Sequence, residues 1–92
     1  IMVPTVDALC VTPICPHMLT NRPVIVPGDA VIQLTLCSDN PTYLTVDGQV
    51  GHHLERDDRV VCRRSQNTVN LILPGGANFF DVLREKLKWG SR

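Results

Sequence analysis

The chain has 92 residues, the size of one small domain, and its nine Lys and Arg side chains are balanced by nine Asp and Glu side chains. A chain of this length buries only a little over half of its unfolded surface, so we expect marginal stability. Balanced charge argues against a dedicated nucleic-acid or membrane-surface protein. No signal peptide or membrane-length apolar run is visible, so we expect a soluble, cytoplasmic protein.

Short strands are predicted along most of the chain, at the spacing of a β-sandwich. The segments are residues 6–12, 24–26, 31–37, 43–46, 59–64 and 68–73. The first is a nearly continuous apolar run, which is typical of a strand buried on both faces. In the third segment, Ile32, Leu34 and Leu36 alternate with polar residues. One face of this strand is therefore predicted to pack in the core, and the other to face either solvent or a ligand site.

Three prolines stiffen the run from Thr12 to Pro23, which connects the first two predicted strands. Each proline fixes a backbone angle and removes a donor, and the residue before it, such as Cys15, is expected to be extended. Such a loop suits a tight corner of a β-fold or the wall of a ligand site, and its composition leaves both open.

Asp47-Gly48 is the pair most typical of a tight hairpin turn with positive φ. A turn accounts for both residues but not for Gln49, which follows them. A glutamine amide carries a donor and an acceptor in one plane, which suits the edge of an amide or a base.

The hydrophobic period changes to a helical one after Gly76. Asn78 is a plausible N-cap, and Phe79, Leu83 and Leu87 fall on one face of a helix. We expect this helix to anchor the C-terminal segment, either on the strands or on a neighbouring domain.

The cysteines, His17 and Arg22 could each have either a structural role or a role in binding a ligand. The four cysteines are expected to be buried free thiols rather than disulfides, and their spacing with the histidines fits no usual zinc site. His17 could pin the loop through a backbone carbonyl or contact a substrate. Arg22 could clamp a phosphate or form an internal salt bridge. No phosphate-binding glycine loop, nucleophile elbow or zinc-protease motif is present.

Three blocks of the sequence together resemble the C-terminal domain of NAD kinases. The run from Thr12 to Pro23 is similar to the signature run of that family, Val46-Asp-Gly-Gln49 to a second block, and residues 78–90 to a third. The blocks stand in the family's order and at about its spacing. The resemblance implies an antiparallel β-sandwich over residues 1–77, with a helix and tail over residues 78–92 that pack on the sandwich or on an N-terminal domain.

The resemblance also implies an activity for the full-length protein. NAD kinases transfer the terminal phosphate of ATP, or in some members of polyphosphate, to the adenosine ribose 2′-hydroxyl of NAD, giving NADP, and they need a divalent cation such as Mg²⁺. The family's catalytic carboxylate belongs to a Gly-Gly-Asp-Gly motif in the N-terminal domain, and this sequence has none. We therefore expect a piece of a longer protein that is inactive alone and supplies no catalytic residue or metal ligand.

A few positions carry over from the family by motif. Gln49 and Gly48 match the turn beside the bound dinucleotide, and Cys15 lies where the proline-rich loop approaches the ligand. His17, Arg22 and Asp47 match family positions that we interpret as holding the loops. Family members assemble as dimers or tetramers, so a homodimer or homotetramer is expected.

Two other functions stay open at this point. The related lipid and diacylglycerol kinases share the architecture and phosphorylate a membrane alcohol, but are not expected to combine the proline-rich block with Asp-Gly-Gln. A non-catalytic β-sandwich binding module is the third possibility.

Overall fold

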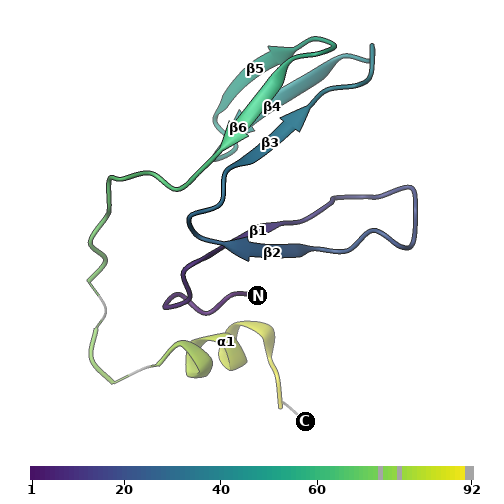
Figure 1. Ribbon diagram of the computed structural model, residues 1–92. Helices are drawn as coiled ribbons and strands as arrows, with labels where there is room; N and C mark the ends of the chain where they lie inside the picture. Colours follow the sequence, from purple (N-terminus) through teal and green to yellow (C-terminus); the bar gives the residue numbers. More distant parts are fainter. Residues whose placement is uncertain (73, 77, 91–92) are drawn as a thin grey trace. The chain divides into compact units, whose positions relative to one another are not determined.

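The computed structural model describes residues 1–72, 74–76 and 78–90. The strands are β1 (Ala8–Val11), β2 (Val24–Pro27), β3 (Ile32–Thr35), β4 (Thr42–Val46), β5 (Val50–Leu54) and β6 (Arg59–Cys62), and the helix is α1 (Phe79–Leu87). All strand pairs are antiparallel (Figure 1). The predicted class, mainly antiparallel β-structure with one C-terminal helix, is therefore confirmed.

The chain divides into two compact units, which are described separately. One consists of residues 7–64 and holds every described strand, and the other consists of residues 1–6 and 65–92 and holds α1. In the first unit the strands form three two-stranded sheets, β1–β2, β3–β6 and β4–β5. Beyond the β3–β6 ladder, the Leu36 N–H donates to the Asp58 carbonyl at 2.9 Å and the Asp57 N–H donates to the Leu36 carbonyl at 2.8 Å.

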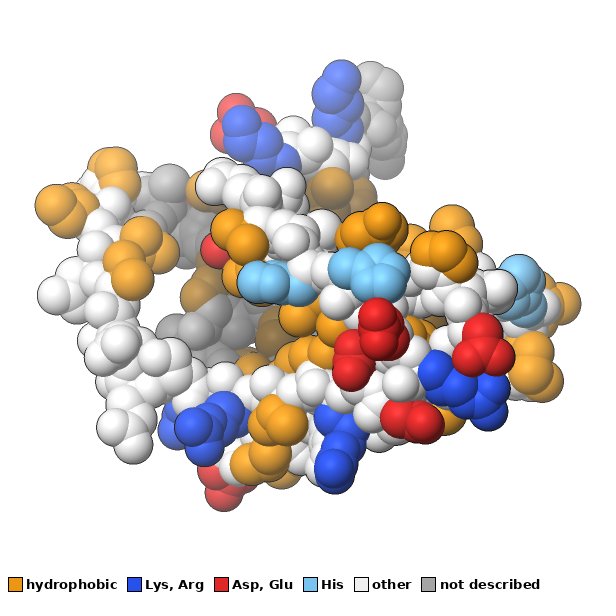
Figure 2. All heavy atoms as spheres, turned by 90° about the horizontal axis from the view of Figure 1, so that it is seen from above, with side chains coloured by type: hydrophobic (Ala, Val, Ile, Leu, Met, Phe, Trp, Pro, Cys, Tyr) orange, Lys and Arg blue, Asp and Glu red, His pale blue; other side chains and the backbone are white. Residues whose placement is uncertain are grey.

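The β3–β6 sheet has one apolar face, as the alternation over residues 31–37 predicts. Leu34 of β3, Leu36 just after β3, and Leu44 and Leu54 of β4–β5 line a shared apolar cavity of about 220 Å³. Leu36, Leu44, Leu54 and Val60 are half-buried there. Among the described residues no hydrophobic side chain is fully buried, and Figure 2 shows hydrophobic side chains spread over the visible face.

One strand was missing from the prediction, and one predicted strand does not form over its described residues. The return strand β5 was not predicted, because Gly51, His52 and His53 have weak strand preferences and β5 exists through its register with β4. Residues 68–72 form no strand, and position 73 lies outside the described residues. Their Val and Leu content favours a strand, but no backbone hydrogen bond from residues 68–72 is found among the described residues.

Strand β1 is not buried on both faces, as its apolar run predicted. Ala8 and Leu9 are half-buried, whereas Cys10 and Val11 are exposed. The reason is that, among the described residues, β1 pairs with a single strand, β2, which leaves much of its surface uncovered.

The helix α1 begins as its sequence predicts. The Asn78 side chain accepts a hydrogen bond from the Asp81 N–H at 2.9 Å, which is the N-cap contact. At the other end Lys88 has a left-handed backbone with φ 55°, and the Trp89 N–H donates to the Arg84 carbonyl at 3.0 Å. These bonds satisfy groups that a helix end otherwise leaves unpaired.

The cysteines are free, as predicted, but all four are exposed rather than buried. Cys10 and Cys62 lie in strands, whereas Cys15 lies in the β1–β2 loop and Cys37 follows β3. In the part of the chain that the structure describes, no helix has the length and apolarity needed to cross a bilayer.

Candidate functional site: two loops and an apolar cleft

The connection between β1 and β2 is held by its own side chains. Nη1 of Arg22 donates to the carbonyl oxygens of Leu19, at 2.7 Å, and Asn21, at 3.2 Å. The Asn21 N–H donates to the Met18 carbonyl at 3.3 Å, which closes a turn inside the loop. Arg22 therefore holds the loop through backbone carbonyls, as interpreted from the family, and it forms no salt bridge with the described residues.

Cys15 stands in an uncommon backbone conformation within this loop. Its φ is +50°, in the left-handed region that costs a residue with a Cβ about 1–2 kcal/mol. The expectation that the residue before Pro16 is extended is therefore wrong. The bend presents the Cys15 side chain to solvent, and a strained residue of this kind is a reason to suspect a functional loop.

His17 does not pin the loop in the way that was predicted. Its ring forms no hydrogen bond with the residues that the structure describes, and the residue is exposed. The ring therefore stays available for contacts outside the described residues.

The turn between β4 and β5 has the predicted geometry. Asp47 and Gly48 have φ angles of 53° and 69°, and the Gln49 N–H donates to the Val46 carbonyl at 3.1 Å. Positive φ at both central residues is the condition under which Asp-Gly is favoured. Gln49 is exposed at the tip of the hairpin, and no described residue hydrogen-bonds to its side-chain amide.

The predicted contact residues lie on two different hairpins. Gly48 and Gln49 share the β4–β5 turn, whereas Cys15 belongs to the β1–β2 loop. No hydrogen bond among the described residues joins these two loops. The first unit therefore offers two separate loop surfaces rather than one closed site.

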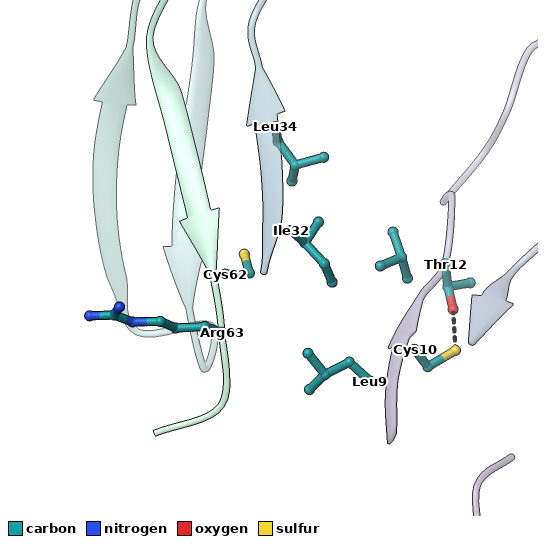
Figure 3. Close-up of a pocket in the computed structure, with 8 residues that line it drawn as sticks. Leu9, Cys10, Thr12, Ile32, Leu34, Cys62 and Arg63 are labelled. Atoms are coloured by element: carbon teal, nitrogen blue, oxygen red, sulfur yellow. Dashed lines mark hydrogen bonds between the residues drawn. The ribbon is translucent and has the colours of Figure 1, made fainter. Parts of the chain in front are cut away.

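An apolar cleft of about 350 Å³ lies between β1 and the apolar face of β3–β6. Figure 3 shows Leu9 from β1 and Ile32 and Leu34 from β3 pointing toward this space. Cys10 also lines the cleft, and its thiol shares a hydrogen bond of 3.3 Å with the Thr12 hydroxyl. The alternation in residues 31–37 could identify the β3 side of the cleft, but no local signal paired it with β1.

No group of three or more His, Cys, Asp or Glu residues that could hold a metal ion occurs among the described residues. The charged side chains instead form surface ion pairs, Asp39 with Arg56 at 3.0 Å, Asp7 with Arg64, and Asp81 with Arg84. Exposed pairs of this kind contribute little to stability.

The chain matches a known family over most of its length. The family model of the ATP-NAD kinase C-terminal domain matches residues 1–73. This stretch holds every described strand, the proline-stiffened loop and the Asp-Gly-Gln turn. The chain therefore belongs to the ATP-NAD kinase family, in which it corresponds to the C-terminal domain.

The relatives that it resembles are bacterial NAD kinases. It is 55% identical to the NAD kinase of Solibacter usitatus, over an alignment that covers 100% of this chain and 32% of that protein. It is 53% identical to the NAD kinase of Acidobacterium capsulatum, covering 100% of this chain and 33% of the relative, and 47% identical to that of Geotalea daltonii, covering 97% and 32%. The chain thus spans about a third of the length of the curated relatives it matches.

Proposed function

We propose that the protein to which this chain belongs is an NAD kinase, which transfers the terminal phosphate of ATP to the adenosine ribose 2′-hydroxyl of NAD and gives NADP. The observation that carries the proposal is the match of the whole chain to relatives named NAD kinase, at up to 55% identity. The alternative of a lipid or diacylglycerol kinase has no comparable support, because the named relatives above are all NAD kinases.

In this proposal the chain contributes part of the NAD pocket and of an oligomer interface. The Gln49 amide is the strongest contact residue, because it is exposed at a hairpin tip with no hydrogen bond from the described residues. Gly48 lacks a side chain and has positive φ, which lets a ligand approach the backbone closely. Cys15 is presented by a stiff loop. A homodimer or homotetramer in the cytoplasm, without nucleic-acid or membrane partners, completes the proposal.

The chemical step requires groups that these residues do not supply. Phosphoryl transfer to a hydroxyl needs a carboxylate near the attacking oxygen and a divalent ion on the phosphates. The described residues offer no cluster that fits a magnesium ion. Both the carboxylate and the Mg²⁺–ATP site are assigned to the remaining polypeptide, about two thirds of the relatives' length.

The test is a phosphoryl-transfer assay on the full-length protein. With Mg²⁺ and ATP, we expect NAD to be converted to NADP and diacylglycerol to remain unphosphorylated. A parallel reaction with polyphosphate shows which donor is used. Phosphorylation of the lipid without formation of NADP, or no transfer to either acceptor while NAD still binds, would contradict the proposal.

A further inference from the structure

The turn between β4 and β5 brings a carboxyl group next to a main-chain nitrogen, and the described residues engage neither of them. Asp47 and Gly48 are both exposed. The Asp47 carboxylate forms no hydrogen bond or ion pair with the described residues, and the Gly48 N–H donates to none of them. The space around Gly48 is open, because a Cβ built there meets no atom within 4 Å. The two groups are therefore free to react with each other.

This arrangement allows aspartate to be converted to isoaspartate through water alone. The Gly48 nitrogen attacks Cγ of Asp47, so that an N–Cγ bond forms, one water molecule leaves and a succinimide ring closes. Water then adds to one of the two ring carbonyls. Addition at Cγ restores aspartate, whereas addition at the main-chain carbonyl carbon breaks the bond of that carbon to nitrogen and leaves the backbone running through Cβ and Cγ. The backbone gains one methylene, and no oxidant or reductant is consumed.

A second aspartate in the same unit shows which features of Asp47 matter. Asp57 is also exposed and left-handed, with φ of 71° against 53° at Asp47, and its carboxylate likewise has no partner among the described residues. The residue that follows it, Asp58, carries a side chain, and its N–H already donates to the Glu55 carbonyl at 3.1 Å. Gly48 has neither obstacle, because glycine has no Cβ and its N–H is free of the described residues.

The sequence gives the same preference, since Asp47 is the only aspartate that glycine follows. We propose that Asp47 is a site of spontaneous isomerisation to isoaspartate in the folded protein. The modification itself does not depend on what the protein binds.

Isomerisation changes the geometry of the hairpin tip. The Gln49 N–H donates to the Val46 carbonyl across the two central residues of the turn. An added methylene at position 47 lengthens the segment that this bond closes, so the Gln49 amide is displaced. We therefore expect isomerisation to weaken the binding of NAD, and this consequence rests on the proposed NAD kinase function.

Mapping of isoaspartate in the full-length protein tests the modification. The protein is kept at physiological temperature and neutral pH, and samples taken over several weeks are digested and analysed by mass spectrometry with electron-transfer fragmentation. We expect isoaspartate at position 47 to exceed that at position 57 several-fold, and Asp47→Glu to remove the signal, because the longer side chain would have to close a larger ring. Equal amounts at positions 47 and 57, or none at position 47 after a synthetic peptide of residues 42–54 has accumulated it, would overturn the proposal.

The consequence for NAD is measured separately. The aged protein is separated by chromatography into fractions with aspartate and with isoaspartate at position 47, and each is titrated calorimetrically with NAD. We expect the isoaspartate fraction to have a Kd at least about fivefold higher, the change that the loss of one hydrogen bond from Gln49 would give. An equal Kd in the two fractions would overturn the consequence but not the modification. Formation of NADP by the fresh protein tests the proposed function independently of both.

Discussion

Among single residues, Gly28 is the one whose missing side chain matters most for packing. It is buried directly after β2, and its N–H donates to the Asp7 carbonyl at 3.1 Å. A Cβ atom at this position would collide with Oδ1 of Asp7 and lie 3.1 Å from Nη1 of Arg64. These two side chains form an ion pair that links the beginning of the first unit to its end.

We predict that Gly28→Ala lowers the free energy of unfolding by at most about 1 kcal/mol, the upper value for an exposed ion pair, because the exposed Asp7 and Arg64 side chains must move aside. Gly51→Ala is the matched control, because a Cβ there meets no atom within 4 Å. Urea denaturation of the full-length protein measures both variants. Equal changes in the two would show that the Asp7–Arg64 contact does not restrict position 28.

At the scale of elements, the helix α1 depends on its N-cap. We predict that Asn78→Ala lowers the free energy of unfolding by about 0.5–2 kcal/mol, because the Asp81 N–H loses the side-chain acceptor that lies 2.9 Å away. Asn78→Asp keeps an acceptor at the same place and should retain most of the stability. Thermal unfolding of the full-length variants checks this, and a loss of equal size in both would contradict the capping role.

The elements also show where the sequence is informative. The helix was predictable because its signals are local: a cap at Asn78, apolar spacing and basic residues near the end. A strand forms only beside a neighbouring strand to which it can hydrogen-bond, and the local sequence does not show that neighbour. For this reason β5 was missed, and residues 68–72 form no strand despite their composition. A strong pattern in a strand becomes structure only when a neighbouring strand satisfies its backbone groups.

The candidate site was predictable in the same uneven way. The Asp47-Gly48 turn follows from a dipeptide preference, and its positive φ angles confirm it. The left-handed Cys15 contradicts the usual preference of a residue before proline. The two carbonyl contacts of Arg22 could not be predicted, because the sequence shows a charge but not the path of the loop around it. The cleft between β1 and β3 required the tertiary fold.

For the molecule as a whole, the described residues contain no fully buried hydrophobic side chain. A cooperative transition requires a packed core, since the entropy of the chain must be offset by burial. We predict that the 92-residue chain, produced alone, binds a hydrophobic dye and melts without a sharp transition. Circular dichroism and dye fluorescence on heating measure this. A steep unfolding curve with no dye binding would show that these residues build a core unaided.

The isolated chain is also predicted to be inactive as a kinase. The described residues offer no metal-binding cluster, and the chain spans about a third of the relatives' length. Incubation with ATP, Mg²⁺ and NAD should therefore give no NADP above the level without protein. NADP formed in proportion to the amount of the chain would place the catalytic groups within these residues.

The most direct test of the account concerns Gln49 in the full-length protein, with Gln33→Ala as a control for the loss of an exposed glutamine amide elsewhere. Calorimetric titration with NAD should show that Gln49→Ala raises Kd about fivefold, as expected for one lost hydrogen bond of about 1 kcal/mol, while Gln33→Ala leaves Kd unchanged. An affinity for NAD that is the same in the Gln49→Ala variant as in the unaltered protein would contradict the placement of the Asp-Gly-Gln turn at the dinucleotide.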